Sequence, residues 1–184
     1  MLAVQIRKIY EIYRKKKSLN NLLDQVMSSR EKLKNKVPIF LKIAPDLSLN
    51  QIDDISEIAL KMQIDAVVAT NTTLDHQGLK SDVKNKQGGL SGRPLFSKST
   101  WVLANLSIRL EKKVPLIGVG GIASAQDAYV KILAGASAVQ LYTGLVYNGI
   151  GLVMKINNGL SEILSKQNKT HLSEIVGSET DEFL

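Results

Sequence analysis

Two motifs in the second half of the sequence combine glycine with small polar residues in a way that suits anion binding. Residues 118–122 read G-V-G-G-I and are followed by Ser124, a residue type that often begins a helix. Thr143 and Gly144 directly follow another apolar segment. Because backbone N–H groups at the start of a helix attract phosphate, the two motifs together predict a phosphate site. The alternative interpretation is that the glycines only allow tight turns after strands.

Lys42 interrupts the apolar segment V-P-I-F-L-K-I-A of residues 37–44. A buried ammonium group is unfavourable unless it meets an anion or a hydrogen-bonding ligand. Lys42 is therefore a candidate ligand-binding residue. The alternative is that it lies in water at the end of a strand.

A polar cluster, Thr70-Asn71-Thr72-Thr73, ends another apolar segment. Its hydroxyl and amide groups could exchange hydrogen bonds with a planar polar ligand, or they could form a turn that merely ends the strand. Further along, residues 88–92 read G-G-L-S-G within a polar stretch from 71 to 94. Connections of this length in a compact unit are more often functional, although a plain flexible connector is the simpler interpretation.

These candidate residues follow apolar segments of the kind that form buried strands. Four such segments occur, at residues 37–44, 65–70, 115–119 and 138–142. Apolar spacing between them predicts helices after residue 48, from 97 to about 110 and from 124 to 135, with N-caps at Ser48, Ser97 and Ser124. Residues 19–34 add one more helix, with no convincing strand ahead of it, and residues 165–184 are predicted to be a polar tail.

Short apolar strands that alternate with amphipathic helices are typical of a parallel sheet covered on both faces. The fold class is therefore α/β, and two architectures fit: an open, doubly wound sheet and a (βα)8 barrel. A closed barrel needs about 250 residues. About four βα units in 184 residues would be half of one. In both architectures ligands bind at the carboxyl ends of the strands, where the candidate residues fall.

Composition excludes several classes of protein. The 184 residues include no cysteine, which rules out disulfides, a thiolate zinc site and a cysteine nucleophile. No apolar run approaches the roughly 20 residues of a membrane-spanning helix, and no secretory signal is visible. We therefore expect a protein on the cytosolic side. We also assign no metal site.

The net charge of +7 comes entirely from the first 36 residues, which hold 10 Lys and Arg against 3 Asp and Glu. The clusters are Arg7-Lys8 and residues 14–17, which read R-K-K-K. Charge runs are usually solvated, so we interpret this segment as a solvated N-terminal region. Contact with an anionic membrane surface or with RNA is the alternative. A nucleic-acid partner is not favoured, because the basic residues are not spread over a folded surface.

Five motifs in order along the chain resemble motifs of the dihydroorotate dehydrogenases. Their residues match the quinone-dependent, membrane-associated class of that family. They are K-I-A-P-D-L-S (42–48), A-T-N-T-T (69–73), G-G-L-S-G-R-P-L (88–95), I-G-V-G-G-I (117–122) and V-Q-L-Y-T-G (139–144). The resemblance implies an FMN-containing (βα)8 barrel. It also implies oxidation of dihydroorotate to orotate in pyrimidine synthesis, with transfer of the electrons to a quinone.

The same resemblance implies roles for individual residues. Lys42 would lie beside the flavin ring and stabilise negative charge on its reduced form. Thr70 would hydrogen-bond the flavin, and Asn71 and Thr72 would bind dihydroorotate. Four further residues would bind FMN: Gly92, Gly121, Tyr142 and Thr143. Gly121, Tyr142 and Thr143 would lie mainly around its phosphate.

The resemblance covers residues 19–165, whereas residues 1–18 do not resemble the family and form an unrelated basic segment. Family members carry, ahead of the helix predicted at 19–34, an N-x-S-S-P-N motif whose serine removes the substrate proton. This sequence has no such motif, so no catalytic base is assigned. The early strands are also missing, as is the helical pair that docks the family on the membrane and forms the quinone tunnel. The chain thus resembles the C-terminal half of the enzyme with an unrelated start, as a frameshift or a disrupted gene would produce.

We expect this fragment to be inactive alone. The family is peripheral on the cytoplasmic side of the membrane, and without the anchoring helices the fragment is expected to be cytoplasmic. Its expected partners are a separate N-terminal half or a second copy of itself, because half a barrel would leave the inward faces of residues 67–69 and 139–141 uncovered. A non-catalytic half barrel that acts as a binding or assembly module is the alternative, since unpaired strand edges invite a partner. A third hypothesis is attachment to nucleic acid or a membrane surface through the basic N-terminus.

Overall fold

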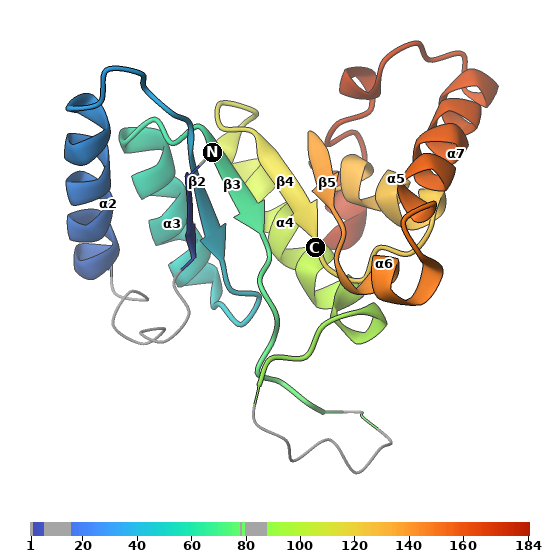
Figure 1. Ribbon diagram of the computed structural model, residues 1–184, viewed down its shortest axis with the longest axis horizontal. Helices are drawn as coiled ribbons and strands as arrows, with labels where there is room; N and C mark the ends of the chain where they lie inside the picture. The colour runs from blue at the N-terminus through green and yellow to red at the C-terminus, as the bar shows by residue number, and fades with distance from the viewer. Residues whose placement is uncertain (1, 6–15, 78, 80–87) are drawn as a thin grey trace.

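The computed structural model describes residues 2–5, 16–77, 79 and 88–184. Its centre is a parallel sheet whose described strands run in the order β1-β2-β3-β4-β5. The strands are β1 (Leu2–Gln5), β2 (Ile39–Ile43), β3 (Ala66–Ala69), β4 (Leu116–Val119) and β5 (Ala138–Gln140). Spatial order follows sequence order, as expected when each crossover returns on the same side of the sheet (Figure 1).

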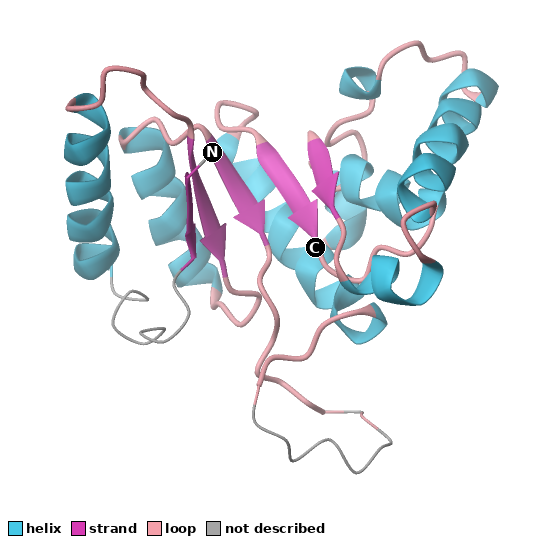
Figure 2. Ribbon diagram, viewed as in Figure 1, coloured by secondary structure: helices cyan, strands magenta, loops and turns pink. Residues whose placement is uncertain are grey.

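Helices cover one face of this sheet. Behind the strands in Figure 2 lie α3 (Leu49–Lys61), α4 (Phe96–Leu110) and α5 (Ala125–Leu133), with α2 (Lys16–Glu31) at one side and α7 (Leu152–Lys166) at the other. The short elements are α6 (Thr143–Asn148) and the 3-10 helices η2 (Arg93–Leu95), η3 (Leu172–Glu174) and η4 (Thr180–Phe183). Among the described residues, none of these helices has the length and apolar character needed to cross a membrane.

The predicted α/β alternation is confirmed, with β2 to β5 and α2 to α5 close to their expected positions. β1 is a correction, because no strand is predicted ahead of the first helix. It pairs with β2 from Leu2 opposite Ile39 to Gln5 opposite Lys42. Four residues are too few to show a period in the sequence. The helices α6 and α7 likewise go beyond the predicted elements.

Two of the three predicted serine caps are confirmed. The side chains of Ser48 and Ser124 each accept a hydrogen bond from a backbone N–H in the first turn of the following helix. The prediction for Ser97 is wrong, because α4 already begins at Phe96, directly after η2. Pro94 in η2 explains the difference, since proline is pre-organised for the first turn of a helix and starts the helical backbone before Ser97 is reached.

The main core lies between the sheet and its helices. Leu41, Val67 and Leu116 occupy matched positions on three neighbouring strands and are at most 3% exposed. They belong to a cluster with side chains of α3 and α4, among them Ile52, Ile58, Val102, Leu103 and Leu106. A second cluster joins α5 to α7 through Ile132, Ile156 and Leu160. Burial of these apolar surfaces holds the helices against the strands.

The opposite face of the sheet is less covered. On this face Phe40, Lys42, Ile117 and Val119 are only half-buried. The expectation of a sheet covered on both faces is therefore wrong for the described part of the chain, in which helices lie on one side (Figure 2). In a closed barrel this inner face meets the side chains of the opposite strands.

The segment predicted as a polar tail, residues 165–184, folds back onto the helices. Ile175 is 5% exposed and joins the cluster of α5 and α7. Backbone N–H groups of Gly177 and Glu179 donate to the carbonyls of Ile132 and Leu133, at 3.0 and 3.3 Å. A mostly polar segment is thus ordered by backbone hydrogen bonds to the end of α5 and by two buried residues, Ile175 and Thr180.

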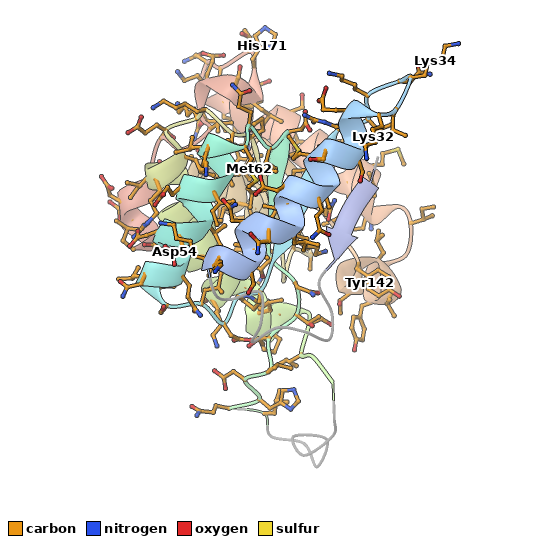
Figure 3. The ribbon with its side chains drawn as sticks, turned by 90° about the vertical axis from the view of Figure 1, so that its left-hand side faces the viewer. Lys32, Lys34, Asp54, Met62, Tyr142 and His171 are labelled. Carbon is orange, nitrogen blue, oxygen red and sulfur yellow. The ribbon has the colours of Figure 1, made fainter. Side chains whose placement is uncertain are left out.

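Most of the basic N-terminal segment lies outside the described residues. Lys16 is described, and its ammonium lies 3.3 Å from Asp54 and 2.5 Å from Glu57, both on α3. Lys32 and Lys34, beyond the end of α2, are exposed and project into solvent (Figure 3). Lys16 therefore links α2 to α3 by an exposed ion pair, a kind of contact that contributes little to stability.

Candidate functional site

A cavity of about 560 Å³ lies at the carboxyl ends of β2 to β5, the end to which the arrowheads point in Figure 1. Its walls come from β2, the segment after β3, the start of η2 and the loops that follow β4 and β5. Small-molecule sites typically have volumes of about 300–1,000 Å³. The cavity therefore has room for a ligand of cofactor size.

All eight residues predicted to bind flavin or substrate line this one cavity. The first four come from β2 and the segment after β3: Lys42, Thr70, Asn71 and Thr72. The other four come from three loops: Gly92, Gly121, Tyr142 and Thr143. They meet because parallel strands end at the same edge of the sheet, so the loops that follow them share one space. The structure establishes their proximity, and their individual roles stay predictions.

Lys42 lies on the half-buried face of β2, between Gln5 of β1 and Val68 of β3 in the register of the sheet. Its side chain belongs to the cavity wall and is not part of the main core. A positive charge in a partly enclosed wall attracts a negative group more strongly than it would in water. This placement favours the ligand interpretation of Lys42 over a lysine in open water.

The polar cluster continues the line of β3 instead of turning away from it. Thr70 N donates to Val119 O at 3.0 Å, and Asn71 N donates to Ile43 O at 2.7 Å, so this backbone bridges β4 and β2. Thr70 is 1% exposed, and its hydroxyl donates to Asn71 O at 2.9 Å. This course along the sheet brings Asn71 and Thr72 to the cavity wall.

Asp46 anchors Thr73 and Leu74, which follow the cavity-lining part of the polar cluster. Its carboxylate accepts hydrogen bonds from Thr73 Oγ1 at 2.5 Å and Leu74 N at 2.9 Å. Lys98 of α4 donates to Asp46 at 3.1 Å and to Asp75 at 2.9 Å. Burial would raise the pKa of Asp46, but the hydrogen bonds from Thr73, Leu74 and Lys98 hold it below its usual value. Asp46 is part of the K-I-A-P-D-L-S motif, yet its role is not visible in the sequence because Lys98 lies 52 residues away.

The glycine loop after β4 packs against the start of α4. Gly120 and Gly121 have φ angles of +121° and +74°, in the region that favours glycine. A Cβ on Gly121 would lie 2.6 Å from the Cβ of Phe96 and 2.8 Å from its Cα. Glycine is therefore required at position 121 by the contact with α4, whatever the cavity binds.

The G-G-L-S-G motif meets the loop after β5. Thr143 Oγ1 donates to Ser91 Oγ at 2.9 Å, and a Cβ on Gly92 would lie 3.1 Å from Thr143 Cγ2. Tyr142 is 81% exposed at the rim of the cavity (Figure 3). Ser91 also lines the cavity and is missed by the sequence prediction. Its place inside a glycine-rich motif was the available signal.

Comparison with known proteins assigns the family. A family model described as dihydroorotate dehydrogenase matches residues 10–164 of the chain. The chain belongs to the dihydroorotate dehydrogenase family. The match includes every residue that lines the cavity, so the candidate site lies within the part of the chain shared with dihydroorotate dehydrogenases.

Curated relatives named dihydroorotate dehydrogenase (quinone) are similar over most of this chain. The protein of Cereibacter sphaeroides (strain KD131) is 52% identical over 163 residues, which are 89% of this chain and 46% of the relative. The protein of Parvibaculum lavamentivorans is 46% identical over 167 residues, which are 90% of this chain and 47% of the relative. The chain thus spans about half the length of the curated dihydroorotate dehydrogenases it matches.

Solved structures show the same partial overlap. The ligand-free dihydroorotate dehydrogenase of Eimeria tenella matches with a TM-score of 0.85 and 32% identity, over 90% of this chain and 50% of that chain. The complex of the Eimeria tenella enzyme with ferulenol matches with a TM-score of 0.85 and 30% identity. The prediction of a partial (βα)8 barrel is confirmed. The boundary between residues 18 and 19 stays a prediction, since the family match begins at residue 10 and residues 6–15 lie outside the described ones.

Proposed function

We propose that this chain is the half of a quinone-dependent dihydroorotate dehydrogenase that carries the FMN phosphate site and part of the dihydroorotate site. The observation that carries the proposal is that residues from separate segments, each implied by the family resemblance, line one cavity. The proposed activity of the complete enzyme is FMN-dependent oxidation of dihydroorotate to orotate with a quinone as electron acceptor.

The lining of the cavity fits FMN. The backbone of Gly92 and Gly121 lines the wall, and Thr143 adds a hydroxyl beside Gly92. Backbone N–H groups and hydroxyls of this kind suit a phosphate. Thr70 would hydrogen-bond the flavin, and Tyr142 would contribute at the phosphate end. FMN supplies the acceptor for the two electrons that dihydroorotate loses.

Asn71 and Thr72 would bind dihydroorotate. An amide and a hydroxyl can both donate and accept, which suits the ring amides and the carboxylate of this substrate. The backbone hydrogen bond from Asn71 to β2 holds the segment in place, so the two side chains start from a rigid position. Lys42 would stabilise negative charge that develops in the ring beside it during the reaction.

Proton removal from dihydroorotate requires a general base, and none of the predicted site residues supplies one. The family uses a serine of an N-x-S-S-P-N motif, which these 184 residues do not contain. A general base typically accelerates a reaction about 10²- to 10⁴-fold. We therefore expect the 184-residue chain to bind FMN weakly and not to oxidise dihydroorotate alone. An N-terminal half from a second chain would complete the site.

Co-expression with the N-terminal half of a family member tests the proposal. The added half should end before the residue aligned with Leu19. We expect the combined protein to retain FMN and to reduce a quinone with dihydroorotate, whereas the chain alone retains substoichiometric FMN and shows no turnover. Asn71→Ala in the combined protein should abolish turnover while keeping the FMN.

Two results would contradict the proposal. The first is failure of both preparations to bind FMN, with circular dichroism showing that they are folded. The second is stoichiometric FMN and quinone reduction by the 184-residue chain alone. The chain would then contain its own general base, whereas the proposal assigns the base to the N-terminal half.

A non-catalytic binding module is the second candidate, and one observation favours it. Around α6 lies a set of apolar side chains that are each at least 66% exposed, here called the α6 apolar surface: Tyr142, Val146, Tyr147, Ile150 and Met154. Apolar exposure of this kind is typical of surfaces that meet a partner. An FMN-free protein that forms a stable complex through this surface would favour the module over the enzyme half.

A further inference from the structure

Lys131 of α5 is a charged residue whose side chain is fully buried, with 0% exposure. Its ammonium donates to Ser99 Oγ and Thr100 Oγ1, both at 2.7 Å, and to Phe96 O at 3.2 Å. The same nitrogen lies 4.7 Å from the centre of the Phe96 ring. Behind it, the Lys131 Cβ lies 3.2 Å from the position that a Cβ on Gly118 of β4 would take. Lys131 thus joins α5 and β4 to the first turns of α4.

The groups that Lys131 holds support the glycine loop of the cavity. Ser99 Oγ, which accepts from Lys131, donates to Leu95 O at 2.8 Å and packs against the loop: it lies 3.4 Å from Gly120 O, and a Cβ on Gly120 would lie 2.6 Å from it. Phe96, whose carbonyl accepts from the same ammonium, is the residue that a Cβ on Gly121 would strike. Gly120 and Gly121 line the cavity, so one residue separates the ammonium from the cavity wall.

The neighbouring charges leave Lys131 without a direct ion pair among the described residues. Asp127, one turn earlier on α5, pairs with Arg93 at 2.5 Å and accepts from Ala123 N at 3.0 Å. The partners of Lys131 on α4 are neutral oxygens and a ring. Burial lowers the pKa of Lys131 to about 7, and the charge of Asp127 opposes this shift. An amine in such surroundings needs a hydrogen-bond network to be retained.

We propose that Lys131 is a positioning residue for the anion end of the cavity, where it fixes the first turns of α4 beneath Gly120 and Gly121 and so holds the loop that receives a flavin phosphate. The inference rests on the proposed function, because the phosphate is the ligand group concerned. An apolar side chain in place of Lys131 would leave the hydroxyl oxygens of Ser99 and Thr100 without their donor, while Phe96 O would keep the hydrogen bonds from those two hydroxyls. The loop would lose the support of the ammonium.

Titrations of the full chain with FMN and riboflavin test this inference, since the two probes differ only in the phosphate. We expect Lys131→Met to weaken FMN binding about tenfold and riboflavin binding less than about twofold, because loss of a charged hydrogen-bond donor typically has that effect on the group it supports. Lys155 of α7 is exposed and provides the matched control. Lys155→Met should leave both affinities unchanged.

Equal weakening of both probes by Lys131→Met, or no change in either, would overturn the positioning role. If circular dichroism shows that this variant does not fold, Ser99→Ala decides. That change keeps the ammonium and removes only the hydroxyl between it and Gly120, and an unchanged ratio of FMN to riboflavin affinity would overturn the inference. If the wild-type chain binds neither probe measurably, the same titrations use the protein combined with a family N-terminal half. A wild-type protein that binds both probes equally, or a combined protein that binds neither, would instead contradict the proposed phosphate site, which separates failure of the proposed function from failure of the role of Lys131.

Discussion

Lys42 can be tested separately from the fold, because its side chain lines the cavity and lies outside the main core. In the chain combined with a family N-terminal half, we expect Lys42→Ala to slow flavin reduction by dihydroorotate about 10²- to 10³-fold, a loss typical of one electrostatic group. FMN content and melting temperature should change little. Rapid-mixing absorbance measures the reduction, and an unmutated rate would show that Lys42 does not stabilise charge.

Gly121 and Gly149 form a natural pair for testing the contact with α4. Their φ angles are +74° and +71°, but a Cβ on Gly121 would strike Phe96, whereas nothing lies within 4 Å of one on Gly149. We expect Gly149→Ala to lower the free energy of unfolding by about 1 kcal/mol through backbone strain. Gly121→Ala should lower it by about 1–3 kcal/mol more, because Phe96 must shift.

Urea unfolding measures these two changes, and equal losses would mean that Phe96 does not restrict position 121. The same contact changes how a flavin-binding result should be interpreted. A bulky residue at position 121 would disturb the start of α4 before it met any phosphate. Loss of FMN in a Gly121 variant is therefore a poor test of phosphate contact, and Lys131→Met is the better one.

At the scale of elements, η3 depends on one carboxylate. Glu174 Oε1 accepts hydrogen bonds from Thr170 N at 2.8 Å and His171 N at 2.9 Å. The backbone hydrogen bond from His171, followed by that from Thr170, lowers the pKa of Glu174 from 4.5 to about 2. Because the folded state depresses this pKa, ionised Glu174 stabilises the fold above pH 4.5, and the contribution disappears as the pH falls toward 2.

We expect the difference in melting temperature between the wild type and Glu174→Gln to be largest near neutral pH and to shrink between pH 4.5 and about 2. Thermal melts followed by circular dichroism over this range measure it. The exposed Glu162 of α7 provides the control variant, Glu162→Gln. A difference that stays constant with pH would contradict the role of the carboxylate.

At the scale of the whole molecule, only one of the two strand segments expected to be uncovered in half a barrel, residues 139–141, is less than fully buried. Val67, Val68 and Ala69 are at most 2% exposed, so the expected uncovered face of β3 is wrong. β5 is the less covered strand, and the α6 apolar surface follows it in the chain. Any association of the chain should therefore involve α6 more than β3.

We expect the 184-residue chain alone to self-associate, because apolar surface that water contacts is removed by pairing of two copies. Charged substitutions in the α6 apolar surface, Val146→Lys with Ile150→Lys, should shift the chain toward monomer. Leu74, which is 64% exposed outside this surface, provides the control, Leu74→Lys. Sedimentation velocity measures the distribution, and a monodisperse wild-type monomer would contradict the prediction.

Local patterns were enough to predict β2 to β5 and the helices between them, and contiguous motifs were enough to single out eight residues that line one cavity, whose roles stay predictions. When one side of a strand or helix is buried, its apolar residues recur with the period of that element. This spacing can be recognised in a short stretch of consecutive residues. The motifs around Lys42, Asn71 and Gly121 are short and contiguous, which is why they could be recognised without the fold. Ser48 and Ser124 were predictable as caps for the same reason, since their partners lie three residues away.

Contacts between distant segments could not be predicted in this way. Lys131 meets Ser99 across 32 residues of sequence, and Asp46 meets Thr73 across 27, so neither pairing leaves a local period. The need for glycine at position 121 comes from Phe96 on another element. Apolar residues such as Ile150 look the same in the sequence whether they are buried or, as here, 89% exposed. Their environment depends on which segments pack together, and that is a property of the folded chain.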